Sequence, residues 1–213
     1  MDILMRRFAL ITFSISLMFS PLLVRSDPLD AVLKSAEKVK SPDRSDNPRD
    51  ILPADVDPES SYGRLFVDSS MKDQIFLWLG DAPEHFIAGR AVSREFKELV
   101  SAKRKFVSSR KVEVVVNVLI PHPAYISMVQ FNLLKEFTNY LPAPMLVDST
   151  ETMDLRGYPG TLYRLKDGKC SVVVRMAKET MVVGLVPSCD NSRELTEVMR
   201  ALDLKRLDAK ISS

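Results

Sequence analysis

Two short runs of apolar residues, nearly unbroken and rich in β-branched and aromatic side chains, dominate the middle of the sequence. They span residues 75–79 (IFLWL) and 112–120 (VEVVVNVLI). Such runs are typical of strands covered on both faces, as in a parallel sheet between helix layers. Between them, apolar residues recur at helical spacing: Phe86, Val92, Phe96, Leu99 and Val100. The pattern therefore predicts a βαβ unit, with Pro83 near the start of its helix.

A second helix is predicted from Pro123 to about Tyr140, because Pro142 and Pro144 cannot continue it. A wide apolar surface indicates that this helix is largely buried. One face carries Tyr125, Met128, Val129, Leu133, Phe137 and Leu141.

The last third of the chain predicts short strands followed by a helix. Strands are expected at 145–148 and 161–165, and Asp167-Gly168 is typical of a hairpin turn. Asn191 or Ser192 caps the final helix. Its apolar face consists of Leu195, Val198, Met199 and Leu202. The expected order of elements is β-α-β-α-β-β-β-α.

The two cysteines stand at the ends of a predicted hairpin. Segments 170–178 and 181–189 pair about a tight turn at Glu179-Thr180, which places Cys170 opposite Cys189. We interpret the pair as a structural disulfide rather than a redox-active one. The same register places five apolar side chains on one face of the hairpin: Val172, Val174, Met176, Val183 and Leu185.

The N-terminus has the pattern of an export signal. Arg6 and Arg7 precede an apolar run over 8–24, and cleavage is expected after Ser26. A retained membrane anchor is the alternative, and either places the protein in the periplasm or outside the cell. An even number of cysteines fits such an oxidising compartment.

Composition divides the rest of the chain. Segment 27–62 predicts a short helix and a flexible linker rich in Pro and Asp, followed by a globular domain over 63–207 and a tail over 208–213. The 213 residues carry a net charge of +2, which argues against a nucleic-acid surface. Two His and two Cys leave few metal ligands, and we expect no metal or other cofactor.

The order of elements, the Pro just past the first core strand and the segment VDSTETMDLRGYPGTLYRLKDGK together resemble the thioredoxin-like fold. The resemblance implies an α/β domain with a mixed sheet flanked by helices and a C-terminal antiparallel hairpin and helix. In this resemblance, Pro159 corresponds to the family's cis-proline. Asp167-Gly168-Lys169 corresponds to the turn at which the following strand reverses direction. Where the family carries Cys-x-x-Cys, this chain has Gly80-Asp81-Ala82-Pro83-Glu84, so disulfide exchange by the family mechanism is excluded. Pro159 in a plain turn, and an α+β domain with an antiparallel sheet, are the open alternatives.

The resemblance also implies a site. Pro83, Glu84 and His85 would lie at a helix start, beside the Tyr158-Pro159 loop. Together they would hold an extended segment of a protein partner. Periplasmic pilus-assembly proteins of F-type conjugation systems are similar in this respect.

Three hypotheses for function remain. The first is a redox-inactive binding module in the cell envelope; the second is an oxidoreductase using Cys170 and Cys189; the third is an unrelated α+β interaction domain. His122 is expected to cap a helix or pack as a ring rather than act as a base. The basic cluster Lys103, Arg104 and Lys105 is placed at a helix end, where it contacts an anionic membrane surface or an acidic partner, or only solvent.

Overall fold

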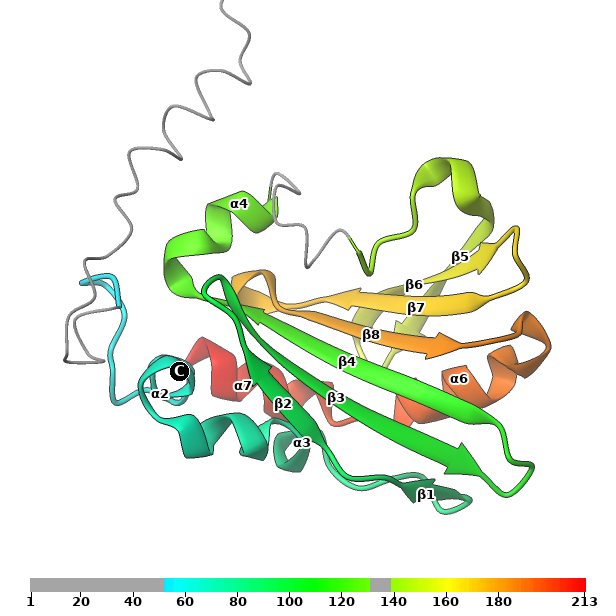
Figure 1. Ribbon diagram of the computed structural model, residues 1–213, viewed down its shortest axis with the longest axis horizontal. Coiled ribbons are helices and arrows are strands. Elements are labelled where there is room, and N and C mark those ends of the chain that lie inside the picture. Colours follow the sequence, from blue (N-terminus) through cyan, green and yellow to red (C-terminus); the bar gives the residue numbers. More distant parts are fainter. Residues whose placement is uncertain (1–51, 131–138) are drawn as a thin grey trace, which may run out of the picture. The chain divides into compact units, whose positions relative to one another are not determined.

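An eight-stranded antiparallel sheet forms the centre of the domain in the computed structural model, which describes residues 52–130 and 139–213 (Figure 1). The strands lie in the order β1-β3-β4-β8-β7-β6-β5, and β2 also pairs with β3. Every pairing is antiparallel. The strands are β1 (Phe86–Ala88), β2 (Val92–Glu95), β3 (Leu99–Ser108), β4 (Glu113–Pro121), β5 (Val147–Leu155), β6 (Tyr158–Leu165), β7 (Cys170–Arg175) and β8 (Met181–Val186).

Helices cover both faces of this sheet unequally. The main core lies on one face, beneath α2, α3, α6 and α7, and a smaller core lies on the other face beneath α4 (Figure 1). The α-helices are α2 (Ser61–Val67), α3 (Ile75–Trp78), α4 (Ile126–Gln130), α6 (Ser192–Ala201) and α7 (Leu204–Ser212). The 3₁₀ helices are η2 (Ser69–Gln74), η3 (Pro123–Tyr125), η4 (Pro144–Leu146), η5 (Ala177–Glu179) and η6 (Cys189–Asn191).

The predicted βαβ unit is wrong. Its first strand, 75–79, contains helix α3, in which Phe76 and Trp78 are buried and Leu77 is 66% exposed. A short apolar run has the same composition whether it is a buried strand or a buried helix, so periodicity could not distinguish them. Here the run contacts α7 and η2 and does not join the sheet.

The helix predicted between the two runs is instead β1, β2 and the start of β3. On β3 the side chains of Val100, Ala102 and Phe106 alternate into the main core. The basic residues at 103–105 hide this alternation in the sequence. The predicted mixed sheet is therefore wrong: the sheet is antiparallel, as the α+β alternative expected. The broader expectation of a domain with both α and β structure is confirmed.

Several local predictions are confirmed. Gly168 has a φ of +83° in the turn between β6 and β7. Helix α6 begins after Asn191 and buries Leu195, Val198 and Met199 as predicted, but the Asn191 side chain makes no capping hydrogen bond. The second predicted helix begins at Pro123 as expected, but residues 131–138 lie outside the described part. The strand predicted at 145–148 is η4 and the start of β5, and the one at 161–165 lies inside β6.

The disulfide between Cys170 and Cys189 is confirmed, with a distance of 4.9 Å between the two Cα atoms. The predicted hairpin register is wrong, because Cys170 pairs with Val186 and Val174 with Val182. The turn holds η5, where Lys178 and Glu179 have positive φ values, so it is longer than the predicted two residues. The observed register differs from the predicted one by three residues. Because three is an odd number, the side chains of β8 that were expected on one face of the sheet lie on the other.

The folded domain extends past both predicted boundaries. Leu52 and Val56, from the predicted linker, pack against the main core, and Tyr62 is fully buried. The predicted tail at 208–213 belongs to α7, and its Ile211 is fully buried. The predicted signal peptide (1–26), the short helix after it and the linker up to residue 51 lie outside the described residues.

Candidate functional site

Strand β5 ends the sheet and has a free edge. It is nine residues long and pairs with β6 on one side. Within 52–130 and 139–213, no strand pairs with its other side. At the opposite end of the sheet the outer strands are only three and four residues long, in β1 and β2. Long unpaired edges present a row of backbone donors and acceptors to another chain.

The β5–β6 turn shows which backbone groups point outward from this edge. Arg156 and Gly157 have φ values of 58° and 92°, as in a two-residue type I′ hairpin. Such a turn closes on a hydrogen-bonded pair, here Leu155 and Tyr158. Hydrogen-bonded pairs alternate along an antiparallel ladder, so the N–H and C=O groups two residues apart share a direction. The outward-pointing groups are therefore those of Thr150, Thr152 and Asp154.

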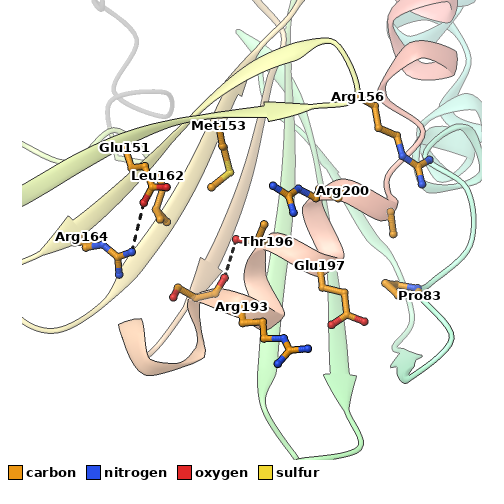
Figure 2. A pocket seen from close by; sticks show the side chains of 12 residues that line it. Pro83, Glu151, Met153, Arg156, Leu162, Arg164, Arg193, Thr196, Glu197 and Arg200 are labelled. Carbon is orange, nitrogen blue, oxygen red and sulfur yellow. Dashed lines mark hydrogen bonds and ion pairs between the residues drawn. The ribbon is translucent and has the colours of Figure 1, made fainter.

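A pocket of about 580 Å³ lies beside this edge, between the β5–β6 hairpin and helix α6 (Figure 2). Four arginines from two parts of the fold line it. Arg156 and Arg164 come from the hairpin, and Arg193 and Arg200 come from α6. Arginine guanidinium groups bind carboxylate and phosphate in planar, bidentate geometry, so the lining favours an anionic group.

The charges in this pocket are only partly compensated. Arg164 forms an ion pair with Glu151 at 3.6 Å. Among the described residues, the guanidinium groups of Arg156, Arg193 and Arg200 make no hydrogen bond or ion pair, although the Glu197 carboxylate also lines the pocket. The pocket therefore keeps an excess of positive charge, and Arg156, Arg193 and Arg200 are exposed and accessible.

A second hollow, of about 650 Å³, continues from this pocket along the edge itself. Arg156 and Arg200 line both hollows, so the charged pocket and the free backbone form one surface. The remaining residues around the second hollow belong to β5 and are Glu151, Thr152, Met153 and Asp154.

The opposite face of the same hairpin carries an apolar groove of about 930 Å³. Nearby, Met145 and Leu146 are 76% and 55% exposed. The free edge is thus bordered by a basic pocket on one face and an apolar groove on the other. The groove is lined mainly by Leu141, Pro142, Pro144, Val147, Pro159, Tyr163 and Val173.

The structure brings together only part of the predicted site. Pro83 lines the arginine pocket, whereas Pro159 lines the apolar groove on the other face of the sheet. Glu84 and His85 are exposed in the loop before β1 and line neither. The described residues contain no cis peptide bond, so Pro159 is trans, in an edge hairpin.

Tyr158 supports the base of the hairpin. Its hydroxyl donates a hydrogen bond to Asp208 Oδ2 at 3.0 Å, and Asp208 Oδ1 accepts one from the Ala177 N–H. Burial, and then the bond to the Asp208 carboxylate, raises the pKa of the Tyr158 hydroxyl above its ordinary value. Tyr158 therefore positions the hairpin against α7.

Sequence reasoning missed the free edge and the arginines. Arg156-Gly157 was a usable signal, since Gly at the second turn position suits a type I′ hairpin. Nothing in the sequence showed that this hairpin lies at the end of the sheet, or that residues of α6 approach it.

The basic cluster lies in the middle of β3, not at a helix end as predicted. Arg104 donates to the Gly89 carbonyl at 2.9 Å and lies over the rings of Phe76 and Phe106. Lys103 and Lys105 point to the opposite face, into a hollow of about 650 Å³. Lys105 also forms an ion pair with Glu113 at 2.8 Å.

His122 caps η3 and packs as a buried ring, as predicted. Its Nδ1 accepts a hydrogen bond from the Ala124 N–H at 3.3 Å, and its ring contacts Phe66 and Tyr125. Its Nε2 is buried and has no hydrogen-bond partner among the described residues. Burial lowers the pKa of the imidazole, and the negative charge of Glu95 opposes this only in part.

We expect His122 to make stability depend on pH. Because its folded-state pKa is depressed, the unfolded chain binds the proton first as the pH falls below about 6.5, and folding stability is lost there. His122→Asn keeps a capping side chain and removes this titration. Urea unfolding at pH 7 and pH 5 should show a smaller loss of unfolding free energy in this variant. His85→Asn, at the exposed histidine, is the control and should behave as wild type; equal losses in all three proteins would contradict the prediction.

A scan of protein-family models found no match to this chain, and neither a search of curated proteins nor a search of solved structures found one. In the part of the chain that the structure describes, no helix has the length and apolar character needed to span a bilayer. Within the same residues, no three or more His, Cys, Asp or Glu side chains gather where they could hold a metal ion.

Proposed function

We propose that this chain is an exported interaction domain that binds an extended segment of a protein partner in the cell envelope. The partner segment adds to the sheet as a further strand beside β5. The free edge of β5 is the observation that carries the proposal, because its outward backbone groups can bind any extended chain. The hollows on both of its faces accommodate the alternating side chains of such a segment.

Two features support export. The pattern of residues 1–26 is that of a signal peptide, with basic residues before an apolar run. The Cys170–Cys189 disulfide is of the kind that persists in oxidising compartments.

A binding role has more support than thiol–disulfide exchange. Segment 80–84 contains no cysteine, so it cannot carry the family's exchange chemistry, and of the two disulfide cysteines Cys170 is fully buried while Cys189 is partly exposed. The proposal also does not depend on the thioredoxin-like resemblance, since it rests on the antiparallel edge and not on a βαβ unit.

Thr152→Pro tests the proposal. The Thr152 N–H points away from β6, so proline at this position leaves the β5–β6 ladder intact and removes one donor from the free edge. The probe is a displayed library of random nine-residue peptides, selected on the full-length protein. We expect the selected peptides to lose about tenfold in affinity for Thr152→Pro. On wild type, their binding should slow amide hydrogen exchange at Thr150, Thr152 and Asp154.

Thr152→Val is the matched control, because it keeps the backbone N–H and the β-branched shape while removing the hydroxyl. Its affinity should stay within about twofold of wild type. Selected peptides that bind Thr152→Pro as tightly as wild type, or that protect other amides, would overturn the proposal. Failure of the library to yield any binder would count against it equally.

A further inference from the structure

We infer that the partner segment is acidic on one face, and that Arg156 and Arg200 bind its carboxylates. This inference rests on the proposed function and deepens it by assigning the chemistry of the partner. It follows from the position of the arginines relative to the free edge and from the charge of the pocket they line.

The first step is geometric. On β5, Glu151 and Met153 face the α6 side, opposite Leu162 and Gly160 of β6. A strand added beside β5 would lie about 4.8 Å further out and share its pleat, so every second side chain would face the α6 side. Those side chains would enter the hollow that Arg156 and Arg200 line together.

The second step is electrostatic. Figure 2 shows Arg156 extending from the β5–β6 turn and Arg193 and Arg200 extending from α6 in different directions, with Glu197 on the same helix. In the second hollow Arg156 and Arg200 lie beside two carboxylates that already have partners: Glu151 is paired with Arg164, and Asp154 Oδ1 accepts a hydrogen bond from the Gly157 N–H at 2.9 Å. Bound carboxylates would satisfy donors that have no partner among the described residues, whereas lysines on the segment would be repelled.

The two faces of the added strand would therefore differ. Side chains directed toward α6 meet the arginines, and those directed the other way meet the apolar groove that Pro159 and Tyr163 line. The segment that fits best alternates acidic and apolar residues.

Two synthetic peptides test the inference on the full-length protein. Both are nine residues long, acetylated and amidated, and alternate valine with either glutamate or glutamine. At low ionic strength we expect the glutamate peptide to bind about tenfold more tightly than the glutamine peptide. In Arg156→Gln/Arg200→Gln this preference should fall below about twofold, because the second hollow then has no arginine to bind a carboxylate.

Lys103→Gln/Lys105→Gln is the matched control, since it removes the same charge from a different face of the sheet. It should keep the preference for glutamate. A preference that the lysine variant abolishes and the arginine variant keeps would overturn the inference.

Amide exchange at Thr152 separates this inference from the proposed function. Equal affinities of the two peptides, with Thr152 protected by both, would overturn the acidic preference and leave strand addition standing. Glutamate binding that Thr152→Pro leaves unchanged would overturn both. Sedimentation velocity tests whether a second copy of the chain occupies the edge. A dimer that Thr152→Pro dissociates would assign the edge to that second copy, and would overturn both the acidic preference and the proposed function.

Discussion

Replacing Cys170 and Cys189 together with alanine should lower the free energy of unfolding by about 3 kcal/mol. The bond joins residues 19 positions apart, and its main effect is to restrict the unfolded chain, which gains entropy once the bond is lost. Alanine avoids placing a new polar group at Cys170, which is fully buried. Urea unfolding of wild type and variant, with far-UV circular dichroism as the readout, measures the difference.

Wild type under reducing conditions provides the control for this prediction. Its loss of stability should match that of the double variant, because both lack the bond and differ only by two thiols. A difference below about 1 kcal/mol between oxidised wild type and the variant would contradict the chain-entropy account of this disulfide.

Gly184→Ala should destabilise the domain by about 2 kcal/mol through overpacking of the main core. Gly184 lies in the middle of β8, where helix α6 crosses the sheet. A Cβ atom there would lie 2.6 Å from Met199 Sδ and 2.7 Å from Leu195 Cδ1. Both neighbours are fully buried in a close-packed core, so their side chains must leave their present positions or α6 must move away from β8.

A double-mutant cycle tests this explanation. Met199→Ala alone creates a cavity, and combining it with Gly184→Ala should cost at least about 1 kcal/mol less than the sum of the two single changes. Gly89→Ala is the control, since the nearest atom to its added Cβ would be the Lys105 carbonyl oxygen at 3.4 Å. Additive effects in the cycle would show that contact with Met199 is not the cause.

Features set by neighbouring residues could be read from the sequence. The spacing of Leu195, Val198 and Met199 predicted the buried face of α6. Asp167-Gly168 predicted the hairpin turn between β6 and β7. The disulfide followed from an even pair of cysteines in a chain whose N-terminus has the pattern of an export signal. Its register did not follow, because the turn before β8 contains no glycine to mark Lys178 and Glu179 as residues with positive φ.

Features set by distant partners could not be read in this way. Segment 75–79 is apolar enough for either a strand or a helix, and packing against α7 rather than a β-strand decides in favour of the helix. In β3, Arg104 occupies a core-facing position because its guanidinium group lies over Phe76 and Phe106, so a strand appears in the sequence as a basic cluster.

By itself, the sequence predicted an export signal, and it determined the covalent link between the cysteines and the elements whose turns and caps are local. Only the tertiary structure decided that every strand is antiparallel, that β5 ends the sheet and that Arg156, Arg193 and Arg200 line one pocket. The physical reason is range. Caps, turns and helical periodicity act over a few residues, whereas strand order and charge clusters depend on contacts between segments far apart in the chain.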